Sequence, residues 1–340
     1  MNSILVILFL FLIIIVNKFF NEKKYLPNYT GNKHQIFTND KPIPLSGGFF
    51  LLLFLTISIF HLSYLLSLFL LLYYLIGFSG DTNFIKSPPL RLLIQLILSI
   101  SFVYFMNLEI TDVRVDFINI IIENKFISIL FTSLCLVILI NGSNFIDGIN
   151  TLLVGYYSII IFILFINFSD SLFFVYSNFY LHLILILFLL YFLNLKNKLY
   201  MGDSGAYILA SFIGFILINL YLSLPYMSPY YIALLLWYPA FENFFSILRK
   251  YNFNRSPIYA DNNHLHQLLF YYLYKKFKFN KLKSNNTSGN IINFYNLVSI
   301  CIGNFYYTQT SILLLILIVN IVVYSFFYIK LIRYKVHSYK

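Results

Sequence analysis

Long apolar runs separated by short polar segments extend along the whole chain. A helix needs about 20 mostly apolar residues to cross the hydrocarbon core of a bilayer, and eleven runs approach this length. The predicted membrane helices cover residues 3–20, 46–62, 64–79, 90–107, 125–141, 151–168, 179–195, 204–223, 230–248, 291–305 and 310–332. The run at 291–305 is weak, so ten helices is the alternative count. Membrane β-barrels show short alternating segments instead, and the pattern therefore predicts an all-α, polytopic membrane bundle.

Composition narrows the class of protein further. Of the 340 residues, 60% are hydrophobic and 10% are charged, whereas a soluble globular chain has about 25% charged residues. A water-soluble enzyme and a disordered chain are therefore excluded. The two cysteines, Cys135 and Cys301, lie in apolar runs and are too few for a disulfide scaffold. Residues 1–340 are interpreted as one membrane-embedded domain.

The basic residues predict the orientation of the bundle. The formal net charge is +11, and in a membrane protein such an excess marks the cytoplasmic loops rather than a nucleic-acid partner. Lys18, Lys23 and Lys24 follow the first run, which places the amino terminus outside. With alternating helices, all of the 23 basic residues except Arg114 and Lys125 fall inside, which favours eleven helices over ten. The predicted cytoplasmic loops are residues 21–45, 78–89, 141–150, 196–203 and 249–290.

Four of the 12 acidic residues stand in short patterned stretches on the predicted inside face. The stretches are residues 77–81 (GFSGD), 141–148 (NGSNFIDG), 201–205 (MGDSG) and 261–267 (DNNHLHQ). Because helix ends at one face of a bundle lie within side-chain reach of one another, we expect their aspartates to form one site. These are Asp81, Asp147, Asp203 and Asp261. Glycines beside the first three allow a backbone to approach a ligand closely. The alternative is a set of unrelated solvated loops.

The donor atoms in these stretches indicate which metal the site suits. They are oxygens, and no Cys or His spacing fits zinc, so the sequence predicts Mg²⁺ or Mn²⁺. Mg²⁺ commonly takes one or two carboxylates and completes its shell with substrate phosphates. A phosphate-bearing substrate also fits the Lys, Arg and His residues on the inside face. Residues 201–205 open a predicted helix, and the N–H groups of a helix N-terminus attract anions.

Ordered motifs over roughly residues 33–267 resemble those of one enzyme family. They are residues 44–48 (PLSGG), Asp81 with Ser87 and Pro88, residues 91–95 (RLLIQ), residues 141–148, residues 201–205, and then His264 and His266. With these motifs in this order, the chain resembles the membrane-embedded polyprenyl-phosphate sugar-1-phosphate transferases. This family is glycosyltransferase family four, which includes the phospho-N-acetylmuramoyl-pentapeptide transferases.

The resemblance implies a reaction, its substrates and its place in the cell. A polyprenyl-phosphate oxygen attacks the β-phosphate of a UDP-sugar, UMP is released, and a polyprenyl-diphosphate-sugar remains. The expected sugar is an N-acetylhexosamine and the expected acceptor is undecaprenyl phosphate, for the synthesis of a cell-surface glycan. The expected location is the bacterial inner membrane, with the active site facing the cytoplasm. Whether the chain forms a homodimer is left open.

The resemblance also assigns roles to individual residues. Asp203 and Asp147 are expected to hold Mg²⁺, and Asp81 is expected to orient or activate the lipid phosphate; all three count as catalytic. Asn144 is expected at the nucleotide, and the two histidines of segment 264–266 at the diphosphate. The full set of expected substrate-binding residues is Lys33, His34, Arg91, Asn141, Asn144, His264 and His266.

The chain departs from the family pattern at three positions. Thr82 stands where the family commonly has a second aspartate, Asn150 where it ends an Asp-Gly-x-Asp motif, and Gln267 where it has a third histidine. Gln267 favours the branch that starts O-antigen, capsule or teichoic-type glycans over the pentapeptide branch. The missing aspartate raises the alternative of a non-catalytic homologue that binds lipid phosphate. A transporter of a lipid-linked solute is the other alternative, although transporters place their polar sites near the midplane.

One further acidic residue, Glu242, lies inside an apolar run. An intramembrane acid is by default a candidate functional residue. The alternative interpretation is a structural pair with Arg249 or Arg255, which follow further along the same segment.

Overall fold

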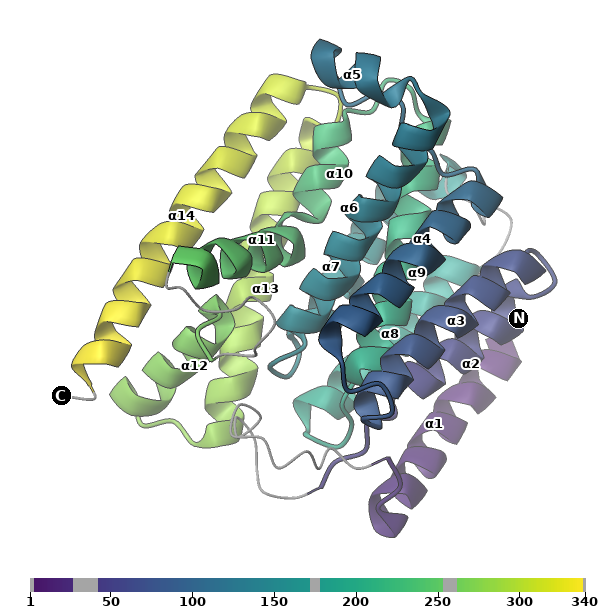
Figure 1. Cartoon of the computed structure of the whole chain (residues 1–340). Helices are drawn as coiled ribbons and strands as arrows, with labels where there is room; N and C mark the ends of the chain where they lie inside the picture. Colours follow the sequence, from purple (N-terminus) through teal and green to yellow (C-terminus); the bar gives the residue numbers. More distant parts are fainter. Residues whose placement is uncertain (1–2, 27–41, 172–177, 253–261, 339–340) are drawn as a thin grey trace.

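The computed structural model describes residues 3–26, 42–171, 178–252 and 262–338, and within these ranges the chain folds into helices without an extended strand (Figure 1). The helices are α1 (Ser3–Lys23), α2 (Gly47–Ile59), α3 (Tyr64–Asp81), α4 (Pro88–Met106), α5 (Asp116–Ile122), α6 (Lys125–Ile146), α7 (Leu152–Phe168), α8 (Phe179–Leu195), α9 (Gly202–Ser223), α10 (Pro229–Leu235), α11 (Trp237–Asn252), α12 (Leu265–Lys276), α13 (Lys281–Phe305) and α14 (Thr310–His337), with a 3-10 turn, η2 (Ser169–Ser171), after α7. Every predicted apolar run coincides with one or two of these helices. The prediction of an all-α bundle is confirmed.

The number of full-length membrane spans differs from the predicted eleven. Seven of the described helices are long and apolar enough to cross a membrane, namely α1, α3, α4, α6, α7, α9 and α14, and the bent pair α10–α11 makes eight if it counts as one span. The apolar runs at 46–62 and 179–195 yield helices of only 13 and 17 residues. The first half of α13 carries Asn and Ser side chains. The structure therefore supports a polytopic helical membrane protein with fewer full-length spans than predicted.

The predicted helix 230–248 is broken at Leu236 into α10 and α11, which meet at an angle of 75°. Pro239 provides the physical reason. It lacks the N–H group that would bond the carbonyl of Leu235 in a continuous helix. It is tolerated in the first turn of α11, where N–H groups have no partner within the helix. After the bend, α11 packs against α6.

The polar segment 249–290, predicted as a cytoplasmic loop, is largely helical where the structure describes it. α12 lies within it, and α13 begins at Lys281, before the apolar run that predicted this helix. Buried polar contacts stabilise the extension of α13: Asn285 Oδ1 accepts a hydrogen bond from the backbone N–H of Asn150 at 2.6 Å. α12 packs against α13 and α14. These contacts involve polar side chains, so a hydropathy pattern does not predict them.

α9 forms the centre of the bundle (Figure 1). It is buried along most of its length and packs against α2, α3 and α6. Small residues allow the close approach of these helices. A Cβ atom added at Gly48 would lie 2.8 Å from the Cα atom of Gly205, and one added at Gly77 would lie 2.5 Å from the Cα atom of Ser204. The N-terminus of α9 is therefore held against α2 and α3.

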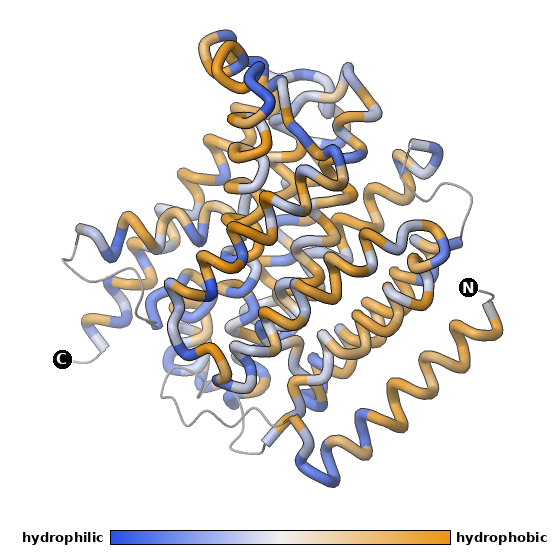
Figure 2. The backbone as a smooth tube through the Cα atoms, turned by 45° about the vertical axis from the view of Figure 1, so that its right-hand side comes forward, coloured by the Kyte–Doolittle hydropathy of each residue, from blue (hydrophilic) through white to orange (hydrophobic). Residues whose placement is uncertain are grey.

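Hydrophobic residues occupy the middles of the helices, and hydrophilic residues gather at helix ends and connections (Figure 2). α1 and α14 lie at opposite flanks of the bundle (Figure 1). The acidic motifs follow the same rule, because Asp81 ends α3, Asp147 follows α6 and Asp203 lies in the first turn of α9.

Candidate active site

Asp81, the last residue of α3, caps the N-terminus of α9. Its carboxylate accepts hydrogen bonds from the backbone N–H groups of Asp203 at 2.8 Å and Ser204 at 3.0 Å. These N–H groups have no partner within the helix, and the helix dipole favours a negative charge at this end. Gly202 has a φ of +73°, and a Cβ atom there would lie 2.8 Å from the Asp81 carboxylate. The cap therefore requires glycine at position 202.

Asp203 forms an ion pair with Arg91 of α4. Arg91 Nη1 donates to Asp203 Oδ2 at 2.7 Å, and the two side chains are 21% and 27% exposed. The side chain of Asn144 of α6 also hydrogen-bonds Asp203. A Cβ atom at Gly80 would lie 2.6 Å from Asp203 Oδ2, so the pair needs glycine at this position. The contacts of Asp203 thus join α4, α6 and α9 at one partly exposed point.

Asp147 follows α6 directly and completes a group of three carboxylates. The backbone N–H of Gly202 donates to it. Burial raises the pKa of Asp147, and the nearby carboxylates of Asp203 and Asp81 raise this pKa further. Like charges at this proximity disfavour the ionised forms, so a cation would stabilise the group. The structure places these three aspartates together, and Asp261 lies outside the described residues.

The histidines of segment 264–266 lie beside the turn that follows Asp147. His264 precedes α12, and its ring stacks on that of His266 with centroids 5.5 Å apart. A Cβ atom at Gly148 would lie 2.8 Å from His266 Nε2. Within the described ranges, neither ring nitrogen of His266 has a hydrogen-bond partner, although the side chain is fully buried. Burial lowers the pKa of His266 to about 3, so the ring is neutral at pH 7.

Two departures from the family pattern have structural roles here. Gln267 Oε1 accepts a hydrogen bond from the backbone N–H of His264 at 3.2 Å, which closes the first turn of α12. Asn150 is buried and donates its backbone N–H to Asn285. Neither contact needs an imidazole or a carboxylate at these positions. The sequence indicated both residues as departures from a motif, and Gln267 also as a sign of the glycan branch, but neither of these structural contacts.

The remaining predicted residues either have internal partners or lie beyond the described ranges. Asn141 Nδ2 donates to Gln95 Oε1 at 2.7 Å and to the carbonyl of Val137 at 2.8 Å, so its amide group links α6 to α4. Lys33 and His34 lie outside the described residues. The expected contacts of these residues with substrate stay predictions.

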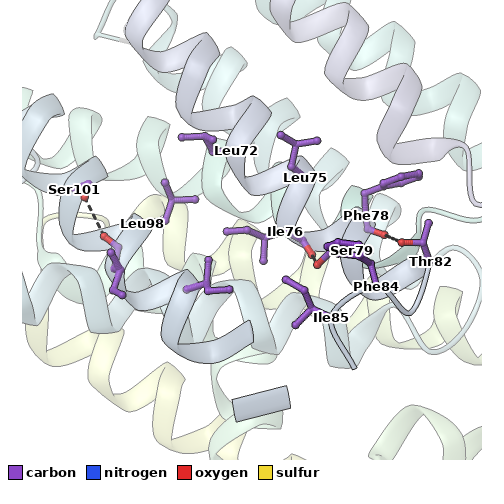
Figure 3. A pocket seen from close by; sticks show the side chains of 12 residues that line it. Leu72, Leu75, Ile76, Phe78, Ser79, Thr82, Phe84, Ile85, Leu98 and Ser101 are labelled. Carbon is purple, nitrogen blue, oxygen red and sulfur yellow. Dashed lines mark hydrogen bonds between the residues drawn. The ribbon is translucent and has the colours of Figure 1, made fainter. Parts of the chain in front are cut away.

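An apolar groove of about 700 Å³ lies between α3 and α4, and Thr82, Phe84 and Ile85 after the end of α3 are among its lining residues (Figure 3). One wall is formed by residues between 72 and 85 and the other by residues between 94 and 101. The hydroxyl groups of Ser79, Thr82 and Ser101 each donate to a backbone carbonyl three or four residues earlier in the chain. Their protons are therefore not available to a ligand in the groove. The groove was not predicted from the sequence, although its lining residues recur at helical spacing on both helices.

Comparison with known protein families matches residues 62–221 to glycosyl transferase family 4. This region belongs to that family. It extends from the start of α3 into the last turn of α9 and contains Arg91 and the three clustered carboxylates. The match supports the family resemblance inferred from the motif order, and residues 62–221 form a membrane-embedded transferase region of family 4. The matched region ends before α11 and the histidine segment. No curated protein matches the chain.

The family 4 site offers oxygen donors for a cation, but not a complete cage. Across residues 3–26, 42–171, 178–252 and 262–338, no group of three or more His, Cys, Asp and Glu side chains is arranged to hold a metal ion. All three carboxylates already accept hydrogen bonds: Asp81 from α9 through both oxygens, Asp203 from Arg91 and Asn144, and Asp147 from the backbone N–H of Gly202. Asp147 and Asp203, the cation ligands that the sequence predicted, would use their remaining lone pairs. Mg²⁺ uses one or two carboxylates when phosphates and water complete its shell. The donor set therefore fits Mg²⁺ together with a phosphate-bearing substrate.

Proposed function

We propose that the chain transfers N-acetylhexosamine-1-phosphate from a UDP-sugar to undecaprenyl phosphate, releases UMP and starts a lipid-linked cell-surface glycan. The observation that carries this proposal is an apolar groove whose lining continues past the end of α3, where the chain has just passed Asp81 of the charged site. Thr82 lines the groove and directly follows Asp81 in the chain. A lipid phosphate fits this arrangement, because its tail is apolar and its head group is anionic. The match of residues 62–221 to glycosyl transferase family 4 supports the transferase chemistry.

The groove suits a lipid tail in length as well as in chemistry. Between residues 72 and 82 a helix rises about 15 Å, which is half of the ~30 Å hydrocarbon core of a bilayer. A tail in the groove therefore reaches the membrane interior while its head group stays at the interface. Lys86, next to the lining residue Ile85, is exposed at this end and adds positive charge.

The proposed reaction forms one phosphorus–oxygen bond and breaks another. An oxygen of the lipid phosphate attacks the β-phosphorus of the UDP-sugar. The bond from that phosphorus to the oxygen bridging the two phosphates breaks, and UMP leaves with the bridging oxygen. Such a transfer depends mainly on positioning and on neutralisation of phosphate charge. Asp147 and Asp203 would hold Mg²⁺, which would supply part of this neutralisation, and the Arg91 guanidinium supplies more.

The other residues of the site position groups in this proposal. Asp81 holds the first turn of α9, and with it Asp203, in a fixed orientation. The histidine pair meets the donor diphosphate. A neutral imidazole carries one N–H, so His266 can donate one hydrogen bond to a phosphate oxygen. The site faces the cytoplasm of a bacterial inner membrane, where UDP-sugars are available.

Transfer can be measured directly with the full chain purified in detergent. Radiolabelled UDP-N-acetylglucosamine, or another labelled UDP-sugar, is incubated with undecaprenyl phosphate and Mg²⁺. Equal amounts of butanol-soluble label and UMP support the proposal. Binding of lipid phosphate without UMP release indicates a non-catalytic homologue. Movement of a lipid-linked solute across vesicles without UMP release indicates a transporter, and either result overturns the proposal.

Removing divalent cations should abolish transfer. The donor diphosphate and the lipid phosphate bring negative charge to a site that already contains three carboxylates, and Arg91 alone does not neutralise it. We expect labelled lipid to fall to background in excess EDTA and to return when Mg²⁺ or Mn²⁺ is added beyond the chelator. Wild-type turnover in excess EDTA would show that the reaction needs no divalent cation.

Filling the groove should weaken binding of the acceptor lipid selectively. Leu98→Trp on α4 places a large ring in the space proposed for the tail, so KM for undecaprenyl phosphate should rise about tenfold or more while KM for the UDP-sugar changes less than about twofold. Leu93→Trp is the matched control, because Leu93 is exposed on the same helix and does not line the groove. Equal changes in the two variants would place the tail elsewhere.

A further inference from the structure

Glu242 of α11 is 1% exposed and lies at the centre of a buried hydrogen-bond network. Its Oε1 atom bonds His264 Nδ1 at 2.9 Å and accepts from the backbone N–H of Leu265 at 3.4 Å. Its Oε2 atom accepts from the hydroxyl of Tyr324 on α14 at 2.9 Å. A buried carboxylate is tolerated only when it is hydrogen-bonded, and here both oxygens have donors. Glu242 therefore links α11, the start of α12 and α14.

Arg249, one of the two partners suggested by the sequence, contacts the segment just before α12. Its Nη1 atom donates to the carbonyl of Asn263 at 2.6 Å and to the hydroxyl of Tyr328 at 3.2 Å. From α14, Lys335 Nζ donates to the carbonyl of Asn262 and to Asn263 Oδ1, each at 2.8 Å. α11 and α14 therefore hold this segment from two sides. The second suggested partner, Arg255, lies outside the described residues.

The bond to Glu242 decides how the His264 ring is presented. The ring faces Glu242 through Nδ1, and the His264 side chain also accepts the backbone N–H of Gln267 in the first turn of α12. Nε2 then lies on the opposite edge of the ring, away from Glu242. Carboxylates fix the orientation of histidines in the same way at metal sites and in catalytic triads. The Phe145 ring, whose centroid is 5.3 Å from that of His264, packs against the imidazole.

We propose that Glu242 is a positioning residue for His264, and that Tyr324 of α14 holds the Glu242 carboxylate from its other side. The inference rests on the proposed function, in which His264 meets the diphosphate of the donor. It also extends the functional part of the molecule beyond residues 62–221, because α11 and α14 follow the matched family region. Glu242 itself contacts no substrate in this arrangement.

A double-mutant cycle tests whether Glu242 acts through His264. Glu242→Gln removes the charge with little change of shape, and kcat/KM for the UDP-sugar should fall roughly 10–100-fold. In a His264→Ala background, the same substitution should change kcat/KM by less than about threefold, because the group that it positions is already absent. Equal fold losses in the two backgrounds would show that Glu242 acts only through the stability of the fold, and would overturn the inference.

Tyr324→Phe is a milder variant that keeps the carboxylate. It should lower kcat/KM severalfold, because one of the donors that fix Glu242 is lost. Tyr295→Phe is the matched control, since its hydroxyl makes a similar bond between α13 and α14, to Asn320 Oδ1 at 2.7 Å. Both variants are compared by thermal unfolding in detergent. Equal activity of the two variants contradicts the role of Tyr324.

Chemical modification separates this inference from the proposed function. His264 is nearly buried, and its carbethoxylation by diethyl pyrocarbonate can be followed by mass spectrometry without turnover. Modification should increase in Glu242→Gln and stay at the wild-type level in Tyr295→Phe. If the wild-type protein transfers no sugar, the proposed function fails, but this measurement still tests the link. Unchanged modification in Glu242→Gln overturns the link in either case.

Discussion

Asp203→Asn should lower the rate of sugar-1-phosphate transfer by roughly 10²–10³-fold or more, while the protein stays folded in detergent. The substitution keeps the size of the side chain but removes the charge that pairs with Arg91. In the proposed function it also removes one of the two carboxylates that bind the cation. Raising the Mg²⁺ concentration should therefore restore part of the rate. The measurement is formation of labelled lipid at saturating substrate, with thermal unfolding as the check on folding.

The matched control is Asp116→Asn, the same chemical change at an exposed position at the start of α5. It should keep the wild-type rate. An Asp203→Asn variant that retains more than about a tenth of the wild-type rate, equivalent to a barrier change below ~1.4 kcal/mol, would exclude Asp203 as a cation ligand.

Asp81→Asn should remove most of the rate at every pH between 6.5 and 8.5. The Asp81 carboxylate accepts from two backbone N–H groups of α9, whereas an asparagine side chain has one oxygen and leaves one of these groups facing an NH₂. The first turn of α9, which carries Asp203, then loses its orientation. A strong base is not required, because the second pKa of a phosphate monoester is about 6 and the lipid phosphate is mostly dianionic at pH 7.5.

The pH series distinguishes this role from general-base catalysis. Recovery of Asp81→Asn to near wild-type turnover at pH 8.5 would mean that Asp81 mainly removes a proton, contrary to the prediction. Thr82→Asp supplies the second carboxylate that the family pattern contains. Because Thr82 lines the groove and the existing acid already caps α9, this variant should change the rate by a few-fold at most.

The positions of the helices follow largely from the sequence. In lipid, each backbone polar group must be satisfied within its own segment, so long apolar runs become helices. The order of the short motifs carried the resemblance to family 4, and the acidic motifs lie at the ends of such runs. The bend at Leu236 was not predicted, although Pro239 lies within the predicted helix 230–248. Hydropathy averages over a window and does not register a single missing N–H group.

The helical structure of the polar segment 249–290 was harder to predict from the sequence. Residues 249–290 have the composition of a solvated loop, yet α12 and the first turns of α13 lie there. Their stability comes from contacts with distant segments, such as the bond between Asn285 and Asn150. The hydropathy pattern along the chain does not show that Asn285 will bond a residue 135 positions away.

The sequence by itself determined the all-helical membrane class, the approximate positions of the helices and the set of acids near helix ends. Only the tertiary structure decided which groups those acids contact. Asp81 bonds the backbone of α9, 122 residues further on, and Glu242 bonds His264 and Tyr324. The groove between α3 and α4 likewise depends on how two helix faces pack. Hydrogen-bond partners and grooves follow from the spatial arrangement of helices, and apolar periodicity specifies only which face of each helix is available.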